Sequence, residues 1–148
     1  SRLGGRWGLC GIRDVMFGNR RRYGDRLSGS EEGIASNILA DRLKRLTAAG
    51  LLSRAPDPAH RQKAIYSLTE ASIELVPLLA HMGAWGCRHT RPSRELSVRA
   101  ELLEEGGPAL WTAFMDELRH LHLGTPKPER SVFAELRAAY EAAMAGKG

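Results

Sequence analysis

The stretch SNILADRLKRLTAA, residues 36–49, decides the fold of this chain of 148 residues. Leu39, Leu43 and Leu46 recur at intervals of four and three residues, which places them in one stripe on a helix. Gly50 follows at the point where helices commonly end in a left-handed residue. The pattern therefore predicts an amphipathic helix, buried along its leucines, whose outward face carries Ser36, Asn37, Ala40, Asp41 and Lys44.

Two short strands are predicted directly after this helix. Residues 51–54 (LLSR) and 64–68 (AIYSL) have strand character, and the segment 55–63 between them holds two prolines and the basic run Arg61-Gln62-Lys63. A hairpin with a basic tip is expected. Upstream, residues 7–18 and 23–28 are predicted helices, separated by a basic run of Arg20, Arg21 and Arg22.

The rest of the chain is predicted to be helical. Thr69 is expected to cap a long helix over residues 70–89, which Pro77 should bend. The apolar face of that helix comprises Leu75, Leu78, Leu79, Met82 and Trp85. After the polar linker 90–94, helices are expected over residues 94–105, 108–123 and 129–145.

The charge of the chain is divided unevenly. Residues 1–91 carry 15 Lys/Arg and 8 Asp/Glu, whereas residues 92–148 carry 7 and 9. A basic first part favours a polyanionic partner, although a basic surface that is merely solvated remains an alternative. No apolar run approaches the roughly 18 residues of a membrane span, and a cytoplasmic location is expected. Cys10 and Cys87 are too sparse for a disulfide scaffold or a zinc site.

The order of helix, short helix, turn, amphipathic helix, hairpin and long helix is typical of a winged helix-turn-helix. The predicted fold class is mainly α with a small β-hairpin wing. The first domain, residues 1–89, would bind DNA and include a long helix (69–89), and residues 90–148 would form a helical C-terminal extension. Physically, an amphipathic helix can enter the major groove while its leucines hold it to the scaffold.

Several short motifs together resemble the HxlR family, which is related to the MarR regulators. They are Gly5-Arg6-Trp7, Arg22-Tyr23, Gly33-Ile34, residues 39–46 (LADRLKRL), residues 50–52, residues 66–69 (YSLT), Leu75-Val76-Pro77 and Trp85-Gly86. The resemblance implies a homodimeric transcription factor whose recognition helix runs over residues 35–49. It also implies that the wing tip holds His60, Arg61 and Lys63, and that the helix after the wing helps to form the dimer.

The candidate DNA-binding residues divide by role. Ser36, Asn37 and Lys44 are candidate readers of bases or backbone, and Ser36 is also a candidate cap of the recognition helix. For Arg42, a phosphate contact and a structural ion pair stay equally open, while Asp41 is expected to pair with a basic neighbour. The candidate phosphate or minor-groove contacts are Arg20, Arg21, Arg22, Arg61 and Lys63.

A second group of residues is a candidate effector pocket, although aromatic residues at helical spacing are more often core. The group comprises His81, Trp85, Trp111, Phe114 and Met115. No enzymatic motif, metal site or cofactor is predicted. The favoured function is a homodimeric regulator, a repressor of a double-stranded DNA operator that responds to a small molecule or another signal. The alternative is a winged-helix protein-interaction module without DNA binding, against which the basic excess argues.

Overall fold

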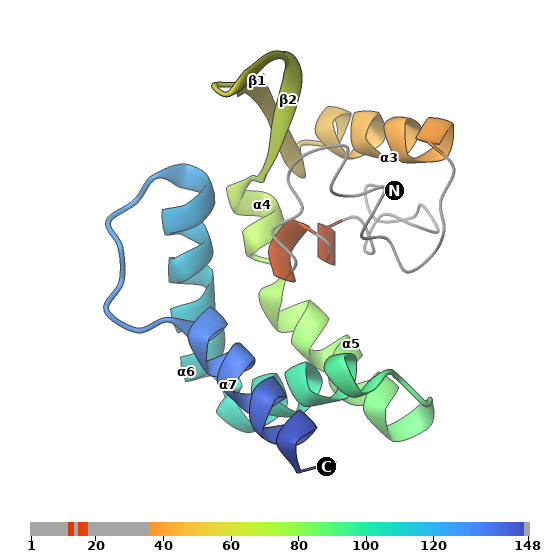
Figure 1. Cartoon of the computed structure of the whole chain (residues 1–148), viewed down its shortest axis with the longest axis vertical. Coiled ribbons are helices and arrows are strands. Elements are labelled where there is room, and N and C mark those ends of the chain that lie inside the picture. Colours follow the sequence, from red (N-terminus) through yellow and green to blue (C-terminus); the bar gives the residue numbers. More distant parts are fainter. Residues whose placement is uncertain (1–11, 14, 18–35, 147–148) are drawn as a thin grey trace. The chain divides into compact units, whose positions relative to one another are not determined.

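The structure, a computed structural model, describes residues 12–13, 15–17 and 36–146, with the backbone alone at residues 36, 37 and 61. The chain divides into two compact units, Ser1–Ile73 and Glu74–Gly148. The first unit contains helical residues at 12–13 and 15–17, then α3 (Ser36–Ala48), β1 (Leu52–Asp57), β2 (His60–Leu68) and α4 (Glu70–Ile73). The second contains α5 (Val76–His89), α6 (Arg94–Leu123) and α7 (Val132–Ala145) (Figure 1). The predicted class, mainly α with a β-hairpin wing, is confirmed.

Helix α3 ends in a hydrogen-bonded turn around Gly50, as the sequence predicts. Gly50 adopts a φ of 77°, which a residue without a Cβ reaches at no steric cost. Its N–H donates to the carbonyl of Thr47 at 3.1 Å, and the N–H of Leu51 donates to that of Leu46 at 2.9 Å. This pair of bonds is a Schellman motif. Leu46 and Leu51, on either side of the turn, are both buried. The turn thus leads the chain from the helix into β1, which begins at Leu52.

The wing is longer than the sequence predicted. Strands β1 and β2 pair antiparallel from Leu52 opposite Leu68 outward, and the register shifts between Pro56 and Asp57. At the turn, the Asp57 carboxylate accepts a hydrogen bond from the N–H of Ala59 at 2.9 Å. The predicted strands 51–54 and 64–68 leave out Pro56, which the structure includes in β1. In a two-stranded sheet both strands are edges, where proline is tolerated.

Thr69 caps α4, which confirms its predicted role as a helix cap. Its hydroxyl accepts from the N–H of Ser72 at 3.4 Å and donates to the carbonyl of Gly50 at 2.7 Å. In return, the Ser72 hydroxyl accepts from the N–H of Thr69 at 3.0 Å. The bond to Gly50 joins the end of α3 to the start of α4, so the wing is held at its base.

The expected continuous helix over residues 70–89 is wrong. Helix α4 ends at Ile73 and α5 begins at Val76, with a turn at residues 74–75. Pro77 explains the break, because proline has no N–H to donate and its ring collides with the carbonyl four residues earlier. Proline is tolerated in the first turn of a helix, and it occupies that position in α5.

Helix α5 packs on α6 through small residues. Val76, Ala80 and Ala84 are its buried side chains, and a Cβ placed on Gly83 would stand 3.2 Å from the Cβ of Ala100. The larger apolar residues point elsewhere: Leu78, Met82 and Trp85 are 42%, 46% and 58% exposed. The predicted apolar face of this helix is therefore largely uncovered in the single chain.

Helix α6 spans the two helices predicted over residues 94–105 and 108–123, joined through a kink. Gly107 at the kink has φ 60° and ψ −159°, a conformation available to glycine, and Pro108 follows it. The kink lies between the predicted helices 94–105 and 108–123, where the sequence separates them. The core of this unit lies along α6 and α7 and comprises Val98, Ala100, Leu103, Leu110, Phe114, Leu118 and Val132.

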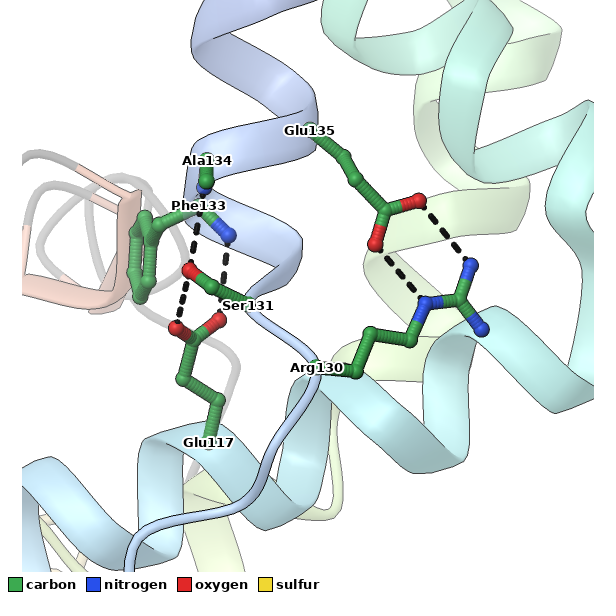
Figure 2. Close-up of polar contacts among 6 residues, drawn as sticks. All are labelled: Glu117, Arg130, Ser131, Phe133, Ala134 and Glu135. Carbon is green, nitrogen blue, oxygen red and sulfur yellow. Dashed lines mark hydrogen bonds and ion pairs between the residues drawn. The ribbon is translucent and has the colours of Figure 1, made fainter.

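A polar joint fixes the start of α7 on α6 (Figure 2). The Glu117 carboxylate accepts from the Ser131 hydroxyl at 2.6 Å and from the N–H of Phe133 at 3.0 Å. The Ser131 hydroxyl also accepts from the N–H of Ala134 at 3.1 Å, which makes it the N-cap. Helix α7 begins at Val132, three residues beyond the predicted start. Within the described residues, no helix combines the length and hydropathy that a membrane span requires.

Candidate nucleic-acid interface

Helix α3 has one buried side and one exposed side, as the leucine spacing predicts. Leu39, Leu43 and Leu46 are almost fully buried, whereas Lys44 is exposed. The helix contacts β1 (Figure 1), so the wing begins beside it. A helix anchored in this way presents its exposed side to a groove of DNA.

Asp41 and Arg45 form an ion pair on the exposed side of α3. The Arg45 Nε lies 2.8 Å from an Asp41 carboxylate oxygen, one turn away along the helix, and both side chains are exposed. This confirms the predicted pairing of Asp41 with a basic neighbour. The pairing offsets the repulsion that a lone carboxylate would exert on a DNA phosphate. Arg45 was not among the predicted site residues, although its spacing from Asp41 could have identified it.

Arg42 is buried, with 6% of its surface exposed. For this residue the sequence left a phosphate contact and a structural ion pair equally open. A buried guanidinium is poorly placed to reach a phosphate at the surface of the molecule, so burial favours the structural role. The role of Arg42 in binding stays a prediction.

The wing carries basic residues on both of its strands. Lys63 is exposed on β2, beside the register shift near the turn. Arg54, on β1 opposite Tyr66, is also exposed. Sequence reasoning missed Arg54 as a candidate. Arg54 is the last residue of the predicted strand 51–54, so the sequence by itself already places this arginine in the wing.

Several predicted contacts lie outside what the structure describes. Arg20, Arg21 and Arg22 fall outside the described residues. Ser36 and Asn37 are placed by their backbone at the first turn of α3, and Arg61 is placed in β2. His60 and Arg61 therefore belong to a strand, next to the turn at residues 58–59, rather than to a broad loop.

The candidate effector residues belong to separate contacts within the second unit. The rings of His81 and Trp111 meet edge to face at 5.1 Å, and Trp85 stacks on His89 at 4.9 Å. Phe114 is fully buried and packs at 5.2 Å against the ring of Phe133 on α7. The predicted pocket lined by His81, Trp85, Trp111, Phe114 and Met115 stays a prediction.

No metal centre emerges from the part of the chain that the structure describes. There, no three His, Cys, Asp or Glu side chains gather as ligands would. Cys87 is a half-buried thiol outside any disulfide, and Cys10 falls outside the described residues.

Comparison with known proteins points to the same elements. An uncharacterized HTH-type transcriptional regulator of Mycobacterium tuberculosis (strain ATCC 25618 / H37Rv) is 33% identical over 84 residues, which cover 57% of this chain and 51% of that protein. MalR of Fusobacterium mortiferum, a candidate regulatory protein, is 33% identical over 86 residues, covering 58% of this chain and 80% of that protein. The chain spans about half the length of the mycobacterial relatives that it matches.

A solved structure is also similar. The crystal structure of PA1607, a candidate transcription factor, superposes with a TM-score of 0.55 at 30% identity, covering 62% of this chain and 61% of that one. The relatives are named as regulators rather than enzymes, in agreement with the prediction. A family model described as HxlR-like helix-turn-helix matches residues 2–94. With its leucine-anchored helix and hairpin wing, this chain belongs to the HxlR-like helix-turn-helix family.

Proposed function

We propose that the chain is a sequence-specific DNA-binding regulator of transcription that acts as a homodimer on a double-stranded operator. The exposed polar side of α3, standing beside a wing with exposed Arg54 and Lys63, carries this proposal. Ser36, Asn37 and Lys44 read the groove. Basic residues of the wing contact phosphates or the minor groove on the flank.

Selection of duplexes from a random pool, followed by fluorescence polarisation, tests the proposal. Arg61→Ala should weaken binding to the selected operator and lower the salt slope by about one unit for the lost phosphate contact, whereas Lys44→Ala should weaken binding and relax the preference at the bases that it reads. Asn37→Ala should instead change the preference at a few base pairs. Lys127→Ala, an exposed lysine between α6 and α7, is the matched control and should leave binding unchanged. Failure to enrich any duplex at low salt would favour the protein-interaction module.

The homodimer rests on the exposed apolar side of α5. Leu78, Met82 and Trp85 follow one another at intervals of four and three residues, so they form one stripe on that helix. A stripe of this kind on the surface of a single chain is typical of an interface between subunits. A second copy, related by twofold symmetry, would cover it and place two α3 helices on successive half-sites.

Light scattering at micromolar concentration tests the dimer. The chain should have the mass of two copies, and Met82→Glu should reduce it to one copy because a carboxylate would be buried without a partner. Leu123→Glu changes a similarly exposed leucine at the end of α6 and should leave the dimer intact. A monomeric mass for the unmodified chain would exclude this arrangement.

The sign and the control of regulation are the finer part of the proposal. We infer a repressor that releases its operator on binding a small molecule near His81, Trp85 and Trp111. Titration of candidate apolar ligands should change the tryptophan emission and lower operator affinity in parallel. A ligand that changes the emission without altering operator affinity would contradict the link between the two sites.

A further inference from the structure

Ile38 is an exposed, large apolar residue on the first turn of the recognition helix. About half of its surface, 49%, is open to solvent, although α3 begins only two residues earlier at Ser36. Its neighbour Leu39 is 2% exposed. The chain thus places two branched aliphatic side chains in succession, one in the core and one outside it.

The position of Ile38 on the helix separates it from the leucine stripe. Successive residues on a helix differ by about 100°, so Ile38 cannot share the side of Leu39. Asp41 and Arg45 follow Ile38 at intervals of three and seven residues, which places all three on one side of the helix. That side is exposed, as the ion pair between Asp41 and Arg45 shows. Ile38 therefore lies one turn before the ion pair, at the end of the helix that enters the groove first in this fold.

The major groove offers one apolar group to such a side chain. Thymine carries a methyl at C5, whereas the other groups on the base edges in that groove are hydrogen-bond donors and acceptors. An aliphatic side chain at the N-terminal end of the helix can bury that methyl, and it has no hydrogen bond to offer to the polar groups around it. Isolated surface isoleucines are also common in proteins. The experiment below therefore distinguishes a thymine contact from an ordinary exposed side chain.

We propose that Ile38 is a specificity-determining residue that packs against the 5-methyl group of a thymine in each operator half-site. This inference rests on the proposed DNA-binding function and names one element of the sequence preference. In each half-site, one A·T pair is selected through an apolar contact, while the polar residues of α3 select its neighbours.

Substitution of thymine by deoxyuridine tests the contact, because uracil pairs like thymine and lacks only the methyl. Each thymine of a selected operator is replaced in turn, and affinity is measured by fluorescence polarisation. The unmodified protein should lose about three- to fivefold in affinity at one thymine per half-site, the value expected for exposing one buried methyl. Ile38→Ala should bind the thymine and uracil operators equally at that position, so that the double-mutant cycle gives a coupling factor of the same three- to fivefold size.

Two controls keep the test sharp. Leu123→Ala removes an equally exposed aliphatic side chain from the other unit and should retain the full sensitivity to uracil. Ile38→Val keeps a methyl at the contact and should retain part of the sensitivity to uracil. Binding of Ile38→Ala to the uracil operator with the affinity of the unmodified protein would show that the variant is folded.

The outcomes distinguish this inference from the function on which it rests. An enriched operator at which uracil substitution has the same effect on the unmodified protein and on Ile38→Ala would overturn the role of Ile38 alone. A random pool that yields no enriched duplex would overturn the proposed function and this inference together. Sensitivity at one thymine that disappears in Ile38→Ala and persists in Leu123→Ala supports the contact.

Discussion

The indole N–H of Trp111 donates a hydrogen bond to the backbone carbonyl of Leu103, with an N–O distance of 2.8 Å, across the kink of α6. Gly107, between the two residues, has left the helical conformation. The indole bond therefore ties the helical segment after the kink to the segment before it. Trp111, predicted as a ligand-pocket residue, has a structural role that any effector site must accommodate.

Trp111→Phe should lower the free energy of unfolding by about 1 kcal/mol, because the part-buried Leu103 carbonyl loses the indole hydrogen bond. Urea denaturation at a fixed protein concentration measures the change. Tyr140→Phe, which removes a polar group from a more exposed ring on α7, is the control and should have little effect. Equal losses in the two variants would argue against a structural role for the indole bond.

Gly50→Ala should destabilise the first unit by about 1 kcal/mol, since an alanine at a φ of 77° brings its Cβ close to the backbone. Gly50→Asn should restore part of the loss, because asparagine tolerates the left-handed region. Gly146→Ala is the matched control: its φ is −69°, and the added Cβ would come no closer than 3.6 Å to another atom. Thermal unfolding followed by circular dichroism compares the three, and an unchanged midpoint for Gly50→Ala would contradict the argument.

Glu117→Ala should loosen α7 from α6, because Ser131 and the N–H of Phe133 lose their shared acceptor. Hydrogen bonds to a charged group contribute about 1.5 to 3 kcal/mol each. Amide hydrogen exchange should accelerate over residues 132–145 more than over α5. Glu141→Ala, a change of an exposed residue on α7 itself, is the control and should leave the exchange rates unchanged. If α7 stayed protected in Glu117→Ala, the apolar contacts alone would be sufficient to hold α7 on α6.

The ion pair between Arg130 and Glu135 should make a pH-dependent contribution to the stability of the second unit. The guanidinium donates to both carboxylate oxygens, at 2.7 and 3.0 Å (Figure 2), and these hydrogen bonds hold the pKa of Glu135 below its usual value. A group whose pKa is lowered in the folded state stabilises that state above its unfolded pKa and loses the effect as pH falls through its folded pKa. The pair is exposed, so the contribution is small.

Arg130→Ala should therefore be less stable than the unmodified protein at neutral pH and equal to it in acid, below the lowered pKa of Glu135. Urea midpoints across that range, with Arg137→Ala as a control for the loss of an exposed arginine, measure the difference. A gap between Arg130→Ala and the unmodified protein that persisted in acid would assign the effect to packing rather than to charge.

Local sequence signals determined much of the first unit. The leucine spacing defines α3 and Gly50 ends it. Thr69 begins the next helix, and Asp41 has a basic partner one turn away. Each of these features depends on residues that are close in the sequence. The same holds for Gly106-Gly107-Pro108. The glycines permit conformations outside the helix and the proline lacks an N–H, so this segment marks the bend of α6 whatever packs around it. The family resemblance, carried by short motifs in order, is confirmed by the match over residues 2–94.

Tertiary structure decided what local patterns leave open. Strand pairing carried β1 through Pro56 to Asp57, because a two-stranded ribbon has no inner strand for proline to disrupt. The packing of α5 on α6 selected Val76, Ala80 and Ala84 as the buried side and left Leu78, Met82 and Trp85 outside. Periodicity identifies an apolar stripe but not its partner, because the hydrophobic effect is non-directional. The burial of Arg42 and the exposure of Ile38 likewise follow from which elements cover α3.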